Sequence, residues 1–358
     1  MPASALSQAP VSKLTTVKPG TIQSVQAARG IAALLVVVCH SGAFLGQVPG
    51  LWQRLPIYLW SRGTVLGVQM FFVISGLVIF RAHRRDFDQP RKAGDFYWKR
   101  FRRIYPLYWI CLTLTVFAHR AATDPYPTYR LPSVLASNYL LVHLYSFQSI
   151  MVQGWTLFDE VQFYLVFALF ILNRRIGFAA LSLWLAASLL FITPSTPYWS
   201  TVFSPYHLLF GLGIVVALAL ETRKRILAAP LLWLGTVVFV GAMIVAGPFN
   251  RSVIVRLVAG AGAACLLLGA ALLERQHRLT IPRWLTLLGD ASYSIYLVHF
   301  MTISAIARFA YAHWRHLPIP IGGWMLLFIL SGVIAGIATH YVVERPLLNA
   351  MGKSSLPR

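Results

Sequence analysis

The stretch "ARGIAALLVVVCHSG" at residues 28–42 decides the class of fold, because it sets an arginine and a histidine inside an otherwise apolar run. Arg29 and His40 lie eleven residues apart. That spacing is close to three helical turns, so both side chains are predicted on one face of a helix, about 16 Å apart along its axis. Ionisable groups inside a membrane span usually face the interior of the bundle and mark a pathway or a site. Arg29 taken alone has a second explanation, because a long arginine side chain near the end of a span can extend to the inner membrane interface. His40 is predicted to be functional.

The composition of the whole chain is that of an integral membrane protein. Of the 358 residues, 58% are hydrophobic and only 11% are charged, whereas soluble domains carry about 25% charged residues. Ten apolar segments approach or reach the length that a membrane-spanning helix needs. The sequence therefore predicts an all-α polytopic membrane protein, a bundle of about ten transmembrane helices. The predicted spans are 24–45, 64–81, 104–119, 156–173, 176–193, 203–220, 230–247, 252–273, 290–311 and 322–342.

The charge of the chain predicts its orientation. The 31 Lys and Arg residues outnumber the 10 Asp and Glu residues, a balance that is also seen in nucleic-acid-binding proteins. Basic residues accumulate in the cytoplasmic loops of membrane proteins, and most of them here fall on one side of the predicted spans. We therefore predict both termini in the cytoplasm and no nucleic-acid partner. Residues 1–20 are predicted to be a disordered cytoplasmic tail, 21–348 the membrane domain and 349–358 a second cytoplasmic tail. The three cysteines show no metal-ligand spacing, so we predict neither a disulfide framework nor a metal site.

The stretch "GWTLFDEVQFY" at residues 154–164 places carboxylates at the outer end of the fourth predicted span. Glu160 lies about 7 Å further along the helix than Trp155, and it shares a helical face with Tyr164. An interfacial belt of Trp and Tyr with a hydrated carboxylate would produce the same pattern. The depth of Glu160 favours a polar cavity instead, while Asp159 is assigned to the hydrated interface.

The stretch "WKRFRRIYPLYW" at residues 98–109 opens the third predicted span with a cluster of cations. Arg100 and Arg103 lie at i and i+3, on one face of the helix. Basic residues commonly flank a membrane span on its cytoplasmic side, and this tendency accounts for such a cluster. A cradle for phosphate groups, which arginine binds through paired hydrogen bonds, accounts for it equally well.

The stretch "LGDASYSIYLVH" at residues 288–299 carries polar side chains into the ninth predicted span. Ser292, Tyr296 and His299 lie at i, i+4 and i+7 and form one polar stripe. Hydrogen bonds between helices explain the serines. His299 is predicted to line the same cavity as His40.

Taken together, these stretches resemble the membrane O-acyltransferases known as the acyltransferase 3 family, from about residue 21 to residue 348. The opening "IQSVQAARGIAALLVVVCH" at residues 22–40 is similar to the branch that modifies exopolysaccharide and O-antigen. The matching motifs are Arg-x10-His at Arg29 and His40, Phe-Phe-x-Ile-Ser-Gly at 71–76, Arg-x-x-Arg before Ile-Tyr-Pro at 100–106, Trp-Thr-Leu-x-x-Glu-x-x-Phe-Tyr at 155–164, Ser-Tyr-Ser-Ile-Tyr-Leu-x-His at 292–299, and Glu-Arg-Pro at 344–346.

The resemblance implies transfer of an acyl group, commonly acetyl, from cytoplasmic acyl-CoA to a hydroxyl of a cell-surface or exported polysaccharide sugar. It implies acyl-CoA as a co-substrate and no permanently bound cofactor. The implied partners are acyl-CoA, a saccharide acceptor and the lipid bilayer. The implied location is the bacterial cytoplasmic (inner) membrane, as a multi-pass protein.

The resemblance also suggests roles for the residues that match. Arg29, Arg100 and Arg103 would bind the phosphates of the donor. His40 would be the general base that removes the hydroxyl proton, because imidazole titrates near neutral pH. Glu160 would orient His40, stabilise its charge, or bind the sugar. Transfer through an acyl-histidine intermediate remains an alternative to direct transfer.

Four more residues are predicted to contact the substrate or the developing oxyanion. His299, or the pair Tyr293 and Tyr296, would donate hydrogen bonds to the oxyanion. Trp155 would contact the substrate at the outer end of its span.

Three other functions are compatible with parts of this pattern. A proton-coupled transporter also needs intramembrane His, Glu and Arg, although the chain has no internal repeat of the kind that many transporters show. An O-acyltransferase acting on a small secondary metabolite, such as a macrolide, would share the donor site. A passive scaffold for polysaccharide assembly would not depend on His40 or Glu160.

Overall fold

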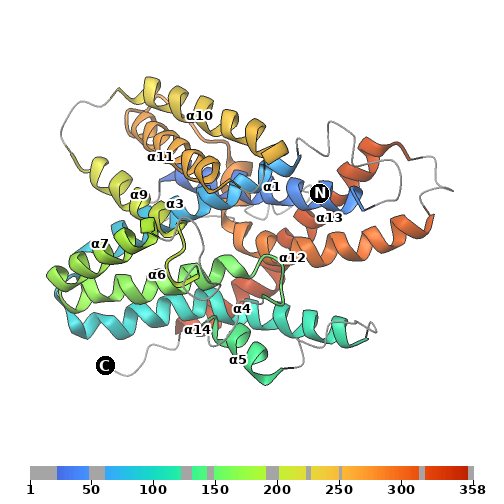
Figure 1. The fold of residues 1–358 in the computed structure, drawn as a ribbon, viewed down its shortest axis with the longest axis horizontal. Helices are drawn as coiled ribbons and strands as arrows, with labels where there is room; N and C mark the ends of the chain where they lie inside the picture. Colours follow the sequence, from blue (N-terminus) through green and yellow to red (C-terminus); the bar gives the residue numbers. More distant parts are fainter. Residues whose placement is uncertain are drawn as a thin grey trace, which may run out of the picture.

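The computed structural model describes residues 22–47, 61–121, 131–142, 149–190, 201–222, 227–249, 252–313 and 319–353, and within these ranges it contains helices and no strand. The predicted tail 1–20 lies outside them, and the predicted boundary at 349 falls inside the last helix. The elements (Figure 1) are α1 (Gln23–Leu45), η2 (Thr64–Leu66), α3 (Gly67–His83), η3 (Arg84–Asp86), η4 (Pro90–Lys92), α4 (Ala93–Ala121), α5 (Pro132–Leu140), α6 (Trp155–Leu172), α7 (Arg174–Leu190), α9 (His207–Ala219), α10 (Ala228–Phe249), α11 (Val253–Arg275), α12 (Arg283–His313), α13 (Ile321–Thr339), η6 (His340–Glu344) and α14 (Arg345–Lys353).

Within the described residues, a helix overlaps each of the ten ranges that were predicted to span the membrane, which confirms the all-α class. In the described part of the chain, seven helical stretches are long and apolar enough to cross a bilayer. They are Gln23–Leu45, Ser61–Asp86, Trp155–Leu172, Ala228–Gly247, Val253–Arg275, Arg283–Ala312 and Ile321–Gly352. Of the others, α9 is apolar but has only 13 residues, and α7 has 17. The number ten and the cytoplasmic position of both termini therefore stay predictions.

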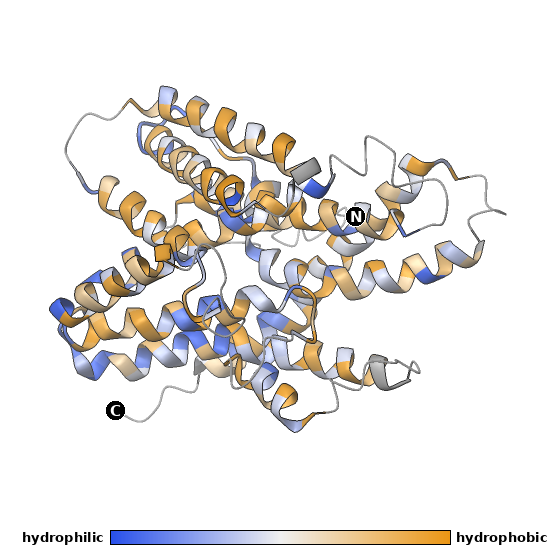
Figure 2. Ribbon diagram, in the orientation of Figure 1, coloured by the Kyte–Doolittle hydropathy of each residue, from blue (hydrophilic) through white to orange (hydrophobic). Residues whose placement is uncertain are grey.

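The outward faces of the peripheral helices are apolar. On α10, Trp233, Val237 and Ile244 are 69%, 66% and 62% exposed, and their spacing of four and seven places them on one face of the helix. Figure 2 shows the apolar colour along most of α9 and α10. Soluble monomers rarely expose large contiguous apolar patches, whereas lipid tails cover such a face without penalty. The protein is therefore a multi-pass membrane protein.

The central helix α3 packs closely against α9 through glycines. A Cβ atom on Gly76 would lie 2.1 Å from the carbonyl oxygen of Phe210, and one on Gly213 would lie 2.1 Å from that of Val73. Only hydrogen fits between the two backbones at these points. This contact holds Ser75, next to Gly76, at a fixed position on α3.

The same kind of contact joins α1 to α12. A Cβ atom on Gly289 would lie 2.0 Å from the carbonyl oxygen of Gln26, and one on Gly30 would lie 2.8 Å from Cβ of Leu288. The two helices run side by side from this point, and they are among the most extensively packed pairs in the protein. As a result, the Arg29–His40 face of α1 meets the polar stripe of α12.

Candidate active site

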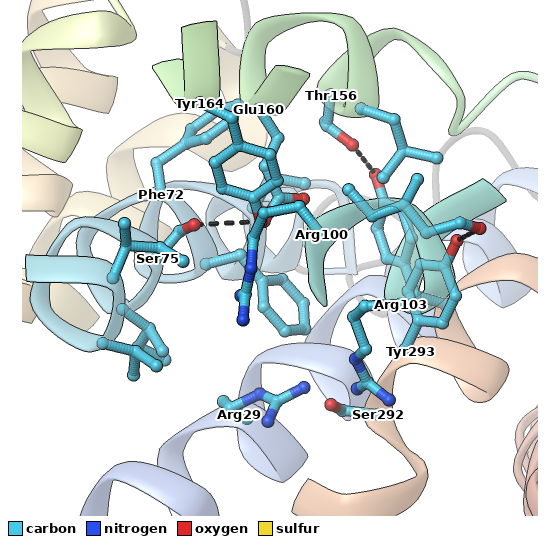
Figure 3. A pocket seen from close by; sticks show the side chains of 18 residues that line it. Arg29, Phe72, Ser75, Arg100, Arg103, Thr156, Glu160, Tyr164, Ser292 and Tyr293 are labelled. Carbon is cyan, nitrogen blue, oxygen red and sulfur yellow. Dashed lines mark hydrogen bonds between the residues drawn. The ribbon is translucent and has the colours of Figure 1, made fainter. Parts of the chain in front are cut away.

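A cavity of about 160 Å³ lies where α1, α3, α4, α6 and α12 meet (Figure 3). Six of the side chains predicted to act in a site line it, from four helices that are far apart in the sequence. They are Arg29, Arg100, Arg103, Glu160, Tyr293 and Tyr296. The apolar part of the wall includes Phe71, Phe72 and Ile104. The predicted polar cavity next to Glu160 is therefore present.

The charged side chains of the cavity wall are three arginines and one carboxylate. Arg29 from α1 donates a hydrogen bond to Oε1 of Gln26, at 3.2 Å. Arg100 from α4 lies over the ring of Tyr164, with its Cζ atom 5.8 Å from the ring centre, and its buried Nε has no hydrogen-bond partner. Figure 3 shows Arg29, Arg100 and Arg103 on facing sides of the same space. This arrangement favours an anionic ligand.

Glu160 is the carboxylate of the cavity. Its Oε1 accepts hydrogen bonds from Oγ of Ser75, at 3.0 Å, and from the hydroxyl of Tyr164 one turn later on α6. The shared face of Glu160 and Tyr164 predicted from their spacing is therefore present. Glu160 was predicted to orient His40, to stabilise its charge or to bind the sugar; among the described residues its hydrogen-bond partners belong to α3 and α6, and its position in the cavity wall leaves the sugar-binding role a prediction. The assignment of its neighbour Asp159 to the hydrated interface is wrong, because Asp159 is buried on another face of α6, where it pairs with the buried His207 at 3.4 Å.

Arg103 forms an ion pair that the sequence motifs did not reveal. Its partner is Glu344 in the π-helical segment η6, and the side chain of Glu344 is only 2% exposed. The second carboxylate oxygen of Glu344 accepts hydrogen bonds from Ser294, at 2.6 Å, and His340, at 2.8 Å. Glu344 was recognised only as part of a Glu-Arg-Pro motif. Nothing in the sequence indicates that the chain after α13 returns to α4.

We expect Glu344→Gln to lower the free energy of unfolding by about 3 kcal/mol, because breaking a buried ion pair leaves the charge of Arg103 without its partner. The measurement is thermal denaturation of the detergent-solubilised protein. The matched control is Glu221→Gln, which breaks an exposed pair with Arg84 and should cost less than about 1 kcal/mol. Equal losses in the two variants would contradict the structural role of Glu344.

His40 and His299 form a direct pair between α1 and α12. Nδ1 of His40 lies 3.0 Å from Nε2 of His299, and Nδ1 of His299 lies 2.9 Å from the carbonyl oxygen of Ile295. The ring of Phe300 packs edge-on against His40, with the ring centres 5.3 Å apart. Both ring nitrogens of His299 are therefore engaged, and this geometry does not offer His299 as the predicted oxyanion donor.

The histidine pair adjoins the cavity but does not line it. Tyr296 lines the cavity, and its ring centre is 6.1 Å from that of His299. Phe71 also lines the cavity and packs against Tyr296, at 5.7 Å. Tyr296 thus connects the arginine-rich cavity to the histidine pair, and Phe71 packs against Tyr296 in the cavity wall.

The two tyrosines use their hydroxyl protons elsewhere. Tyr293 donates to the carbonyl oxygen of Ile104, at 2.6 Å, and Tyr296 donates to that of Gln153, at 2.9 Å. A carbonyl oxygen can only accept, so these bonds must break before either tyrosine can serve as the predicted oxyanion donor. Ser292 is the contrasting case, because its buried Oγ lies in the cavity wall without a hydrogen-bond partner.

The remaining predicted residue, Trp155, lies beside the cavity. Its ring packs against Phe72, at 6.2 Å between centres, and against Tyr206, at 5.6 Å. Phe72 lines the cavity, so Trp155 supports the wall from behind.

The three cysteines are all free. Within the described ranges, no group of three or more His, Cys, Asp or Glu side chains could hold a metal ion.

Comparisons with known proteins agree on one family. The family described as Acyltransferase domain (Acyl_transf_3) matches residues 22–341. Exopolysaccharide production protein ExoZ of Rhizobium meliloti (strain 1021) is 32% identical over 300 residues, which are 79% of this chain and 89% of that protein. Acyltransferase MdmB of Streptomyces mycarofaciens is 28% identical over 379 residues, 93% of each chain. Protein 2 in picA locus of Rhizobium radiobacter is 33% identical over 87 residues, 24% of this chain and 39% of that protein. No solved structure matches the chain.

Proposed function

We propose, from the premise that this chain belongs to the Acyltransferase domain family, that it transfers an acyl group from cytoplasmic acyl-CoA to a hydroxyl of a cell-surface or exported polysaccharide. The protein is an integral-membrane O-acyltransferase. The donor, the acyl group and the acceptor are the new parts of the proposal. We further propose that both termini lie in the cytoplasm of a bacterial cell, with the protein in the inner membrane.

The observation that carries the choice of donor is the convergence of Arg29, Arg100 and Arg103 on one cavity. Acyl-CoA bears several phosphate groups at one end and a thioester at the other. Arginine binds phosphate through paired, charge-assisted hydrogen bonds. In this proposal the arginines hold the phosphate end of the donor, and the thin thioester end extends past Tyr296 and Phe71 toward His40. Acetyl is the acyl group that we propose.

The choice of acceptor is supported by the similarity to ExoZ, whose name associates it with exopolysaccharide production. The name of MdmB states only that it is an acyltransferase. Trp155 is the first residue of α6, and an aromatic ring at the end of a membrane-spanning helix can contact a sugar. A small secondary metabolite is the alternative acceptor.

The reaction in this proposal is direct transfer with His40 as the general base. A ring nitrogen of His40 takes the proton of the acceptor hydroxyl while the hydroxyl oxygen bonds to the thioester carbon. The carbon–sulfur bond then breaks, and the protonated imidazole returns its proton to the departing thiolate. The products are the acylated sugar and the free thiol of CoA, and no residue of the protein is consumed.

The proposal is tested with purified protein in detergent or nanodiscs. With acetyl-CoA and the polysaccharide of the host cell, the protein should release CoA thiol in step with acylation of the sugar, detected by mass spectrometry. Surface polysaccharide from cells that lack the protein should have lost the same acyl mass. Movement of a substrate across vesicles without CoA would favour a transporter instead. Acylation of a small metabolite, with no change in the polysaccharide, would overturn the proposed acceptor.

A further inference from the structure

The histidine pair contains a chain of hydrogen bonds whose direction is fixed at one end. The carbonyl oxygen of Ile295 can only accept, so Nδ1 of His299 must carry a proton and donate it along the 2.9 Å contact. His299 is fully buried at 0% exposure, and neither the imidazole of His40 nor the carbonyl oxygen of Ile295, its two hydrogen-bond partners, offers a negative charge. A buried cation without a counter-charge is costly, so His299 is neutral and its Nε2 holds a lone pair.

The same reasoning then fixes the tautomer of His40. Nε2 of His299 can only accept in this state, and Nδ1 of His40 lies 3.0 Å away. Nδ1 of His40 must therefore carry the proton and donate it. A neutral imidazole has only one N–H, so Nε2 of His40, on the opposite side of the ring, is left with a lone pair. A general base needs such a lone pair, on the nitrogen that does not bond to the other histidine.

The packing around the pair holds this arrangement in place. A Cβ atom on Gly332 of α13 would lie 3.1 Å from Cβ of His299, so the small residue on α13 makes room for the imidazole. Phe300 contacts the ring of His40 edge-on. The contact between α1 and α12 at Gly30 and Gly289 sets the distance between the helices.

We propose that His299 is a positioning residue that keeps the proton of the neutral His40 ring on Nδ1 and thereby leaves Nε2 as the basic nitrogen for the acceptor hydroxyl. This inference rests on the proposed function of His40 as the base. When Nε2 of His40 takes the acceptor proton, the ring becomes a cation with two N–H groups, and the bond from Nδ1 to His299 becomes charge-assisted. His299 then stabilises the protonated base without itself touching the substrate.

The kinetic test compares two substitutions of His299. His299→Gln can keep an acceptor oxygen near the position of Nε2, whereas His299→Phe keeps the ring volume but has no acceptor. We expect His299→Phe to lower kcat by about 10²- to 10³-fold with little change in the KM for acetyl-CoA, and His299→Gln to stay within about tenfold of wild type. His277→Asn, an exposed histidine with a positive φ of 56°, is the control for loss of an imidazole elsewhere. Equal rates in His299→Phe and wild type, or equally low rates in both His299 variants, would overturn the inference.

A spectroscopic test reads the tautomer in the wild-type protein and uses a variant only to assign the signal. Nuclear magnetic resonance of protein labelled with ¹⁵N-histidine reports which ring nitrogen carries the proton. The signal of His40 is the one that disappears in His40→Ala. In the wild-type protein we expect this signal to be that of a neutral ring protonated at Nδ1. A neutral His40 ring protonated at Nε2 would overturn the role of His299 even if His40→Ala is inactive. If His40→Ala keeps the wild-type rate, the proposed function of His40 fails instead, whatever tautomer is observed.

Discussion

Purified His40→Ala protein is expected to transfer acyl groups about 10²- to 10⁴-fold more slowly than wild type, the range that a positioned general base contributes. Its affinity for CoA is expected to change by less than about threefold, because the substitution acts on the chemical step. The structure explains this separation. The arginines line the cavity, whereas the pair His40–His299 does not line it and adjoins it through Tyr296.

The measurement is CoA-thiol release with acetyl-CoA and acceptor, together with calorimetric titration of CoA into the same sample. His277→Asn again serves as the control, since it removes an exposed imidazole outside the site. A wild-type rate in His40→Ala would remove this histidine from the reaction. The carboxylate of the cavity, Glu160, would then be the next candidate for the base.

The sequence predicted the fold because hydrophobic length is a local property. Apolar runs near 20 residues place helices at all ten expected ranges. The number of membrane crossings was harder to predict from the sequence. The range 104–119 is only the second half of the 29-residue helix α4, and α9 is shorter than a bilayer requires. Whether such segments cross depends on how neighbouring helices shield their ends, which composition does not encode.

Helical periodicity also predicted which side chains share a face. Glu160 and Tyr164 meet one turn apart, as their spacing requires. Contacts between helices could not be predicted in this way. One of the roles predicted for Glu160 was to orient His40, and the sequence also placed His299 in the same cavity as His40. The structure pairs His40 with His299, because the close contact at Gly30 and Gly289 sets the rotation of α1 against α12.

The roles of single polar groups were the hardest to predict, because they depend on which atoms are already bonded. Tyr293 and Tyr296 point their hydroxyl groups at main-chain carbonyls, a geometry that no residue pattern reveals. In the same way, the pairing of Arg103 with Glu344 joins residues 241 positions apart. Because of that pairing, the two arginines of the Arg-x-x-Arg motif differ in their partners: Arg103 has a buried carboxylate, whereas Arg100 lies over the ring of Tyr164.

Arg100→Gln is expected to raise the KM for acetyl-CoA by about 10- to 100-fold, the loss that follows when a charge-assisted hydrogen bond of about 1.5–3 kcal/mol is removed. Its kcat and its melting temperature should change little. Arg100 is free to bind a ligand in this way because its guanidinium lies over the ring of Tyr164, and its Nε has no hydrogen-bond partner. The measurements are steady-state kinetics with varied acetyl-CoA and thermal denaturation of each variant.

Arg103→Gln is the matched comparison one turn along α4. Because Arg103 pairs with the buried Glu344, its loss should lower the melting temperature as well as the affinity for the donor. Arg91→Gln, in the exposed segment before α4, should change neither. Donor KM values equal to wild type in both Arg100→Gln and Arg103→Gln would show that these cations only flank the membrane, which is the other explanation that the sequence allowed for them. A raised KM in Arg100→Gln at unchanged stability would instead identify the cavity as the site of the donor phosphates, since a flanking charge has no reason to act on substrate binding alone.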